Sequence, residues 1–128
     1  MSINCIRALI EKANRVCPDK VAIIDGHKSL TYAELFRKVN QIARYFTELK
    51  LESGTRIGIY SHKSSEQIVA ILAMLSTEYI FVPISRLLKP EQVEHIIKDC
   101  DIACIITDKS KIKSIDEIAY SGKIVTYE

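Results

Sequence analysis

Several features that would point to a particular function are missing from this sequence of 128 residues. No apolar run reaches the roughly 20 residues needed to cross a bilayer, and charges interrupt the N-terminal stretch where a signal peptide would be apolar. The formal net charge is only +2, with lysines and arginines spread along the chain. These absences argue against a membrane span and give no special indication of nucleic acid or an anionic membrane. We therefore expect a cytoplasmic protein that binds neither.

Glycine is scarce, with four residues in the chain, and none lies between the predicted strand at residues 56–61 and the helix that comes after it. The next segment, Ser61 to Ser65, lacks the glycines of a dinucleotide fold or a P-loop. Lys63 and the amides near Ser64 could still attract an anion at a helix N-terminus. We prefer the alternative of a simple solvated helix cap.

A second polar segment, Thr107 to Ser110, superficially looks like a phosphate loop because it combines hydroxyls with Lys109. Without glycine its amides cannot readily converge on a phosphate, so we interpret it as a polar turn around Asp108. Asp25 and Glu34 cannot be assigned as an acid/base pair, because one belongs in a turn and the other in a helix cap. We therefore predict no catalytic, cofactor-binding or metal-binding residue in this chain.

Cysteines and histidines are scattered. The four cysteines are Cys5, Cys17, Cys100 and Cys104, and the three histidines are His27, His62 and His95. Without secretory features the cysteines are expected to be free thiols. Cys100 and Cys104 have a spacing that could hold a metal on one helix, but Cys100 should end a helix and Cys104 should lie in the strand IACIIT. Buried apolar cysteine is the favoured interpretation, and the histidines are interpreted as surface or helix-flank residues.

The N-terminal third predicts a helix, a hairpin and a second helix. Residues 4–16 show amphipathic spacing with Asn4 as a possible cap, and Asp25-Gly26 marks a tight turn between strands. Thr31 and Glu34 form the pattern of a capping box for a helix that extends to Leu49. Leu30 and Leu35 occupy the positions of a hydrophobic staple. Gly54 is available for a left-handed turn into the next strand.

Strands then alternate with helices. The predicted strands are RIGIYS, YIFVPI, IACIIT and KIVTY. Between them we predict a helix capped by Ser64, a helix begun by Pro90, and a short helix or irregular turn at residues 109–120. The face of the first helix expected to lie toward the sheet consists of Ile68, Ile71, Leu72 and Leu75. This alternation predicts an α/β fold: a three-layer, Rossmann-like, mainly parallel sheet flanked by helices, preceded by an N-terminal helix and a β-hairpin. We expect one domain over residues 1–128, with the helix and hairpin in 1–32 and the α/β unit in 33–128.

With these elements in order, the chain resembles the N-terminal part of the adenylate-forming (AMP-binding) enzymes. The matching segments are PDKVAI at 18–23, LTYAEL at 30–35, IGIY at 57–60, AILAML at 70–75, YIFVPI at 79–84 and KPEQV at 89–93. LTYAEL resembles the first core motif of the family, and VPI resembles the end of the second. The sequences of these motifs most resemble those of adenylation domains of nonribosomal peptide synthetases, with acyl-CoA synthetases and D-alanine-carrier-protein ligases as further relatives.

This resemblance implies a ligase that uses ATP and Mg²⁺ to convert an amino acid or another carboxylic acid into an acyl-adenylate. The acyl group then passes to the thiol of a carrier protein or of CoA. The catalytic motifs of the family would lie beyond the last residue of this chain, so the chain alone is expected to bind no cofactor and to be inactive. Its expected partners are the remainder of the parent enzyme, with self-association through exposed surfaces as a further possibility. The alternative is a non-catalytic interaction module derived from this fold.

One departure from the family pattern stands out. Family members usually have Lys-Ala-Gly before the second core strand and Asp-Pro after it, whereas here Ser76-Thr77-Glu78 and Ser85-Arg86 occupy those places. Glycine is favoured where a helix ends in a left-handed residue. Glu78 must therefore either accept a strain of about 1 kcal/mol or the helix must end differently. The full-length enzyme from which this segment comes could therefore be a diverged homologue and not a typical active member of the family.

Overall fold

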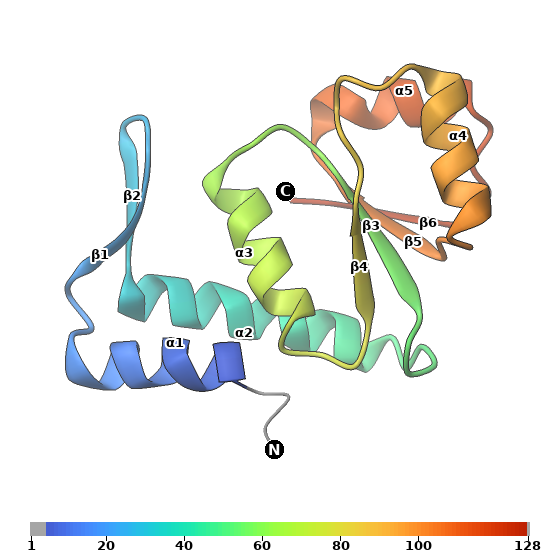
Figure 1. Cartoon of the computed structure of the whole chain (residues 1–128). Helices are drawn as coiled ribbons and strands as arrows, with labels where there is room; N and C mark the ends of the chain where they lie inside the picture. Colours follow the sequence, from blue (N-terminus) through green and yellow to red (C-terminus); the bar gives the residue numbers. More distant parts are fainter. Residues whose placement is uncertain (1–4, 128) are drawn as a thin grey trace. The chain divides into compact units, whose positions relative to one another are not determined.

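The computed structural model describes residues 5–127, which form two compact units (Figure 1). The first unit contains the described residues up to Leu51 together with Ser64–Glu78, and the second contains Glu52–Lys63 and the residues from Tyr79 onward. The prediction of one domain over residues 1–128 stays a prediction.

The first unit holds α1 (Cys5–Val16), β1 (Val21–Asp25), β2 (Lys28–Thr31), α2 (Tyr32–Glu48) and α3 (Ser65–Met74). As predicted, β1 and β2 pair antiparallel, and Gly26 adopts a positive φ of 61° in the turn that joins them. Glycine takes this conformation without the clash that a Cβ atom would cause. The proposed cap at Asn4 lies outside the described residues.

The start of α2 follows the predicted capping box. The Glu34 amide donates to Thr31 Oγ1 at 3.2 Å, and the Thr31 amide donates to Glu34 Oε1 at 2.9 Å. The end of the helix differs from the prediction, because α2 stops at Glu48 and Lys50 takes the left-handed conformation with φ of 54°. Gly54, with φ of 83°, is left-handed as predicted, but it serves a later turn.

Helix α3 begins as predicted, with the Gln67 amide donating to Ser64 Oγ at 3.1 Å. Its buried face is formed instead by Val69, Ala70, Ala73 and Met74, whereas Ile68 and Leu75 of the predicted face are exposed. That prediction was wrong because the segment is apolar on nearly all sides after Gln67. Periodicity cannot identify the buried face of a helix that has no polar face.

Hydroxyl groups end α3 in place of glycine. Ser76 Oγ donates to the Leu72 carbonyl at 3.0 Å, and Thr77 Oγ1 donates to the Met74 carbonyl at 2.7 Å. These bonds satisfy carbonyls that have no partner within the helix. Glu78 does not adopt a positive φ. The helix therefore ends differently from the family pattern, and Glu78 carries no left-handed strain.

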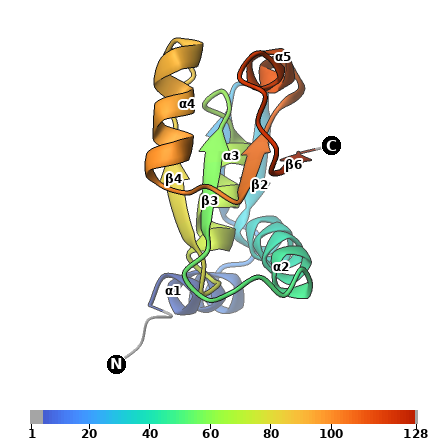
Figure 2. The same cartoon turned by 90° about the vertical axis from the view of Figure 1, so that its right-hand side faces the viewer.

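The second unit is a four-stranded sheet with helices alongside it (Figures 1 and 2). Its elements are β3 (Arg56–Tyr60), β4 (Ile80–Pro83), α4 (Pro90–Asp99), β5 (Cys104–Thr107), η1 (Lys109–Lys111), α5 (Ile112–Glu117) and β6 (Lys123–Thr126). The strand order is β4-β3-β5-β6 and every pairing is parallel, which confirms the predicted parallel α/β sheet. Pro83 is accommodated because β4 is an edge strand, where a missing amide donor breaks no ladder on the open side.

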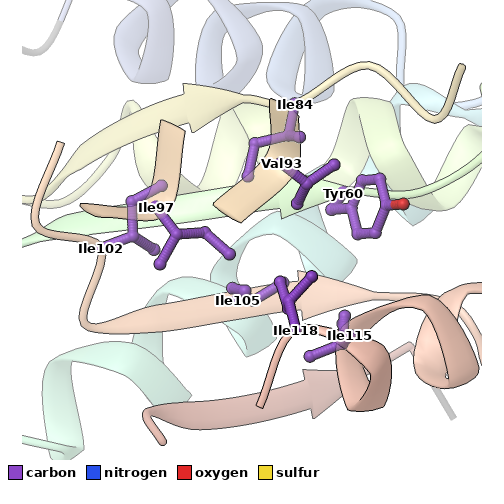
Figure 3. Close-up of a cluster of buried hydrophobic side chains, with 8 residues drawn as sticks. All are labelled: Tyr60, Ile84, Val93, Ile97, Ile102, Ile105, Ile115 and Ile118. Carbon is purple, nitrogen blue, oxygen red and sulfur yellow. The ribbon is translucent and has the colours of Figure 1, made fainter. Parts of the chain in front are cut away.

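One cluster of buried side chains joins the helices of the second unit to its sheet (Figure 3). Its members are Tyr60, Ile84, Val93, Ile97, Ile102, Ile105, Ile115 and Ile118. Gly58 belongs to the same face of β3, and an added Cβ there would lie 3.1 Å from Ile84 Cδ1 and 3.3 Å from two atoms of Ile102. The cluster fixes α4 and α5 against the strands. It thereby positions the turns that follow β3 and β5.

Candidate functional site

The carboxyl ends of β3 and β5 form the point in the second unit where a ligand would be expected. The chain leaves β3 for β4 on one side and then returns to β5 on the other side. In open parallel sheets, ligands bind beyond the strand ends at such a reversal of strand order. The residues to consider are therefore those of the two turns that begin at Ser61 and Asp108.

Short hydrogen bonds tie the last residues of these strands together. The buried Thr107 hydroxyl donates to the Tyr60 carbonyl at 2.6 Å, which links β5 to β3. The Ser61 hydroxyl lies 2.8 Å from the Tyr127 hydroxyl, and the Tyr127 amide donates to the Thr107 carbonyl at 3.3 Å. Three strand ends are thus fixed to one another by their own polar groups.

His62, Asp108 and Ser110 come together at this edge. The His62 amide donates to Asp108 Oδ2 at 2.8 Å, and His62 Nδ1 lies 3.1 Å from the same oxygen. The Ser110 hydroxyl lies 2.9 Å from His62 Nδ1, while its amide donates to Asp108 Oδ1 at 2.9 Å. Sequence reasoning treated these residues separately. The sequence contained one indication that they lie close together, because His62 and Asp108 each follow the end of a predicted parallel strand.

These three residue types match a hydrolytic triad, but their geometry does not. In a triad the acid contacts one imidazole nitrogen and the serine contacts the other. Here the carboxylate and the hydroxyl both contact Nδ1 of His62. Ser110 Oγ also donates to Asp108 Oδ1. The imidazole therefore cannot act as a general base toward Ser110 while Asp108 orients it from its other nitrogen, and the cluster joins two turns.

The Asp108 carboxylate is stabilised in its charged form. Partial burial acts to raise its pKa, but hydrogen bonds from Ser110 and His62, together with the charge of His62, outweigh burial and lower the pKa to about 2. Asp108 also caps η1 through the Ser110 amide. Both carboxylate oxygens thus have partners within the protein.

Lys111 connects the same edge to the turn after β4. Its ammonium donates to the Arg86 carbonyl at 2.9 Å and lies 5.5 Å from the centre of the Tyr60 ring. An ammonium at this distance from an aromatic face is attracted by the ring quadrupole. Lys111 is therefore engaged within the structure, whereas Lys63 and Lys109, the lysines of the two predicted turns, are exposed.

The N-terminus of α3, in the first unit, was the other candidate anion site. There the Asp25 carboxylate accepts a hydrogen bond from the Ser65 amide at 2.9 Å, and the Ser64 hydroxyl accepts from the Gln67 amide. Glu66 in the first turn pairs with Lys28 at 3.1 Å. A negative side chain of the protein thus occupies the place that an external anion would take.

The remaining candidates stay apart. Cys100 caps the end of α4 and Cys104 lies in β5, as predicted, and burial raises the pKa of the Cys104 thiol to about 11. His27 and His95 are exposed. Among the side chains that the structure describes, residues 6–127, no three histidine, cysteine or acidic groups are clustered as a metal site would require. Glu34 serves only in the capping box, where hydrogen bonds from Thr31 lower its pKa.

An open pocket of about 270 Å³ lies at the opposite edge of the second unit. It is lined by the end of α4 and by the turns that lead into β5 and β6, including Ile102, Tyr120 and Gly122. The Tyr120 hydroxyl donates to the Ile102 carbonyl at 3.0 Å, and burial raises its pKa to about 12. This pocket is at the amino ends of the strands, away from the edge that parallel sheets use for ligands.

Within the described residues, no helix is both long and apolar enough to cross a membrane.

Comparison with known proteins identifies a family to which this chain is similar. A model of the family described as AMP-binding enzyme matches residues 10–127. Tyrocidine synthase 1 of Brevibacillus parabrevis is 32% identical over 123 residues, which is 96% of this chain and 11% of that protein. The chain thus spans about a tenth of the length of this curated relative.

Solved structures share the fold. The anthranilate CoA ligase AuaEII in complex with anthranoyl-AMP has a TM-score of 0.86 at 21% identity, covering 98% of this chain and 26% of the ligase. The nonribosomal peptide synthetase FmoA3, bound to α-methyl-L-serine-AMP, has a TM-score of 0.82 at 21% identity, covering 94% of this chain and 14% of FmoA3. The predicted resemblance is confirmed. This chain belongs to the AMP-binding enzyme family.

Proposed function

We propose that this chain forms the N-terminal part of a ligase that uses ATP and Mg²⁺ to activate an amino acid or another carboxylic acid as an acyl-adenylate. The acyl group then passes to the thiol of a carrier protein or of CoA. The observation that carries this proposal is the family match over residues 10–127. The acyl-adenylates bound to two structural neighbours support it, because both are products of this reaction type.

Within such an enzyme, we assign this segment a structural role. The turns at residues 61–65 and 107–110 offer few free donors to a nucleotide, since the amides of Ser65 and Ser110 already donate to carboxylates of the chain. Lys111 is likewise engaged by the Arg86 carbonyl. A triphosphate would have to displace these internal partners. We therefore assign no step of the reaction to the residues of this segment.

The test of the activity is ATP–pyrophosphate exchange with a panel of amino and fatty acids. It is run on the longest reading frame that contains the segment. Exchange stimulated by one acid supports the proposal and identifies the substrate class. If that frame encodes a Gly/Ser/Thr-rich loop ending in lysine and the purified protein still shows no exchange with any acid, the proposed activity is wrong.

The structural role needs a separate test on the 128-residue chain itself. Calorimetric titration with MgATP should give no heat of binding, and the chain should not catalyse exchange. Micromolar binding would contradict the structural role. A chain that binds no ATP but captures a protein partner, with no activity in the longer frame, would favour the interaction module over the ligase.

A further inference from the structure

We propose that His62 and Asp108 form a pH-dependent tether that holds the turn after β3 to the turn after β5. The two residues are 46 positions apart in the sequence, and they meet at the reversal of strand order in the second unit. This device is independent of the proposed ligase activity, because it depends only on contacts within the second unit.

The hydrogen bonds determine where the protons lie. Ser110 Oγ donates its proton to Asp108 Oδ1, so this hydroxyl can only accept from His62. Asp108 Oδ2 can also only accept, since the carboxylate is ionised. Both partners of Nδ1 are therefore acceptors, and Nδ1 must carry a proton. Nε2 is left as the nitrogen that gains or loses a proton.

Asp108 is the charged side chain that contacts His62. Lys63 follows it on its own turn and Lys109 follows Asp108 on the facing turn, and both lysines are exposed. The end of β6 contributes Tyr127, which is engaged with Ser61. The Asp108 side chain is 19% exposed and that of His62 is 47% exposed. Solvent can thus exchange protons with the imidazole of His62, while His62 Nδ1 and Asp108 Oδ2 stay in contact.

The sign of the pH effect follows from the two charge states. With Nε2 protonated, the imidazolium donates to a carboxylate, and such a charge-assisted bond is roughly twice as strong as a neutral one. With Nε2 deprotonated, Nδ1 still donates, but the ion pair is lost. Histidine side chains ordinarily change charge between pH 5 and 8. The tether is therefore stronger when the imidazole is charged than when it is neutral, and Asp108 is ionised in both states.

The proton assignment is tested on the unmodified chain by ¹⁵N–¹H long-range correlation NMR between pH 5 and 8.5. The expected result for His62 is a neutral form that carries its proton on Nδ1, the less common tautomer in free histidine. His95, which is exposed on α4, is the internal reference and should show the common tautomer. A His62 signal with the proton on Nε2 at high pH would overturn the proposal.

The energetic coupling is tested by a double-mutant cycle with His62→Gln, Asp108→Asn and the double variant. Each stability is measured by urea denaturation at pH 5 and pH 8.5. The coupling should multiply the folding equilibrium constant about threefold at pH 5, as for a partly exposed ion pair, and less than about 1.5-fold at pH 8.5. The backbone bond from the His62 amide to residue 108 is changed in the same way in both Asp108 variants, so it cancels from the cycle.

A matched cycle with His95→Gln and Asp108→Asn should show no coupling at either pH. Coupling between His62 and Asp108 that does not change with pH, or that equals the His95 control, would overturn the tether. If a variant fails to fold, the NMR assignment on the unmodified chain decides the question.

Discussion

The Asp25 carboxylate accepts a hydrogen bond from the Ser65 amide at 2.9 Å, so the last residue of β1 is joined to the first residue of α3. The partial positive charge of a helix N-terminus favours a negative group at this position. The acid at the end of β1 therefore has an electrostatic role in the first unit. This contact also makes the start of α3 a poor site for a phosphate.

Replacing Asp25 tests this contact. Asp25→Ala should lower the free energy of unfolding by about 1 to 2 kcal/mol, because it removes both the acceptor and the charge at the helix N-terminus. Asp25→Asn, which keeps an acceptor, should lose about half as much. Both are measured by urea denaturation. Asp19→Asn, at an exposed position, is the control, and a loss at Asp25 no larger than that of the control would contradict the role.

The elements of this chain were predictable because their signals are local. The capping box at Thr31, the turn at Gly26 and the proline at the start of α4 each need only a few neighbouring residues to act. The parallel sheet followed from the alternation of strands and helices. Local chemistry and the final structure agree at these positions, as expected for a minimally frustrated sequence.

The contacts at the candidate site were not predictable in the same way. His62 and Ser110 lie 48 positions apart, and Asp25 and Ser65 lie 40 positions apart. Their meeting depends on strand order and on tertiary packing, which a single sequence does not specify. The buried face of α3 was missed for a different reason, since a helix that is apolar on nearly all sides carries no periodic signal.

The capping box at the start of α2 gives a second prediction. Thr31→Ala should destabilise the chain by about 1 kcal/mol, because the Glu34 amide loses its acceptor. Thr31→Ser keeps the hydroxyl and should change the free energy of unfolding by much less. Thermal and urea unfolding of both variants provide the measurement. Equal losses in the two variants would show that the methyl group of Thr31, and not its hydroxyl, stabilises the start of α2.

Two exposed positions predict opposite effects of glycine. Ala119 has a φ of 51°, where a Cβ atom is strained, so Ala119→Gly should raise the free energy of unfolding by about 0.5 to 1 kcal/mol. Glu78 has no positive φ, so Glu78→Gly should lower it by a similar amount through the greater freedom of the unfolded chain. Denaturant midpoints of the pair are compared under identical conditions. A stabilising Glu78→Gly would mean that α3 ends as in the family pattern after all.

Acid should weaken the second unit through Asp108. Its pKa lies at about 2 in the folded chain against an ordinary value of 3.8, so the folded state binds this proton less readily than the unfolded state. The resulting stability is fully present above about pH 4 and is lost as the pH falls toward 2. Because water near this edge screens the interaction, we expect a contribution of about 1 kcal/mol.

The measurement compares the unmodified chain with Asp108→Asn by urea denaturation at intervals from pH 6 to pH 2. The stability difference should be about 1 kcal/mol at pH 5 and should be mostly lost by pH 2, since the variant has no proton to gain at this position. Asp116→Asn, at an exposed position in α5, controls for the general effect of removing a negative charge. A difference for Asp108 that persists unchanged to pH 2 would mean that its carboxylate is not held in the charged form by His62 and Ser110.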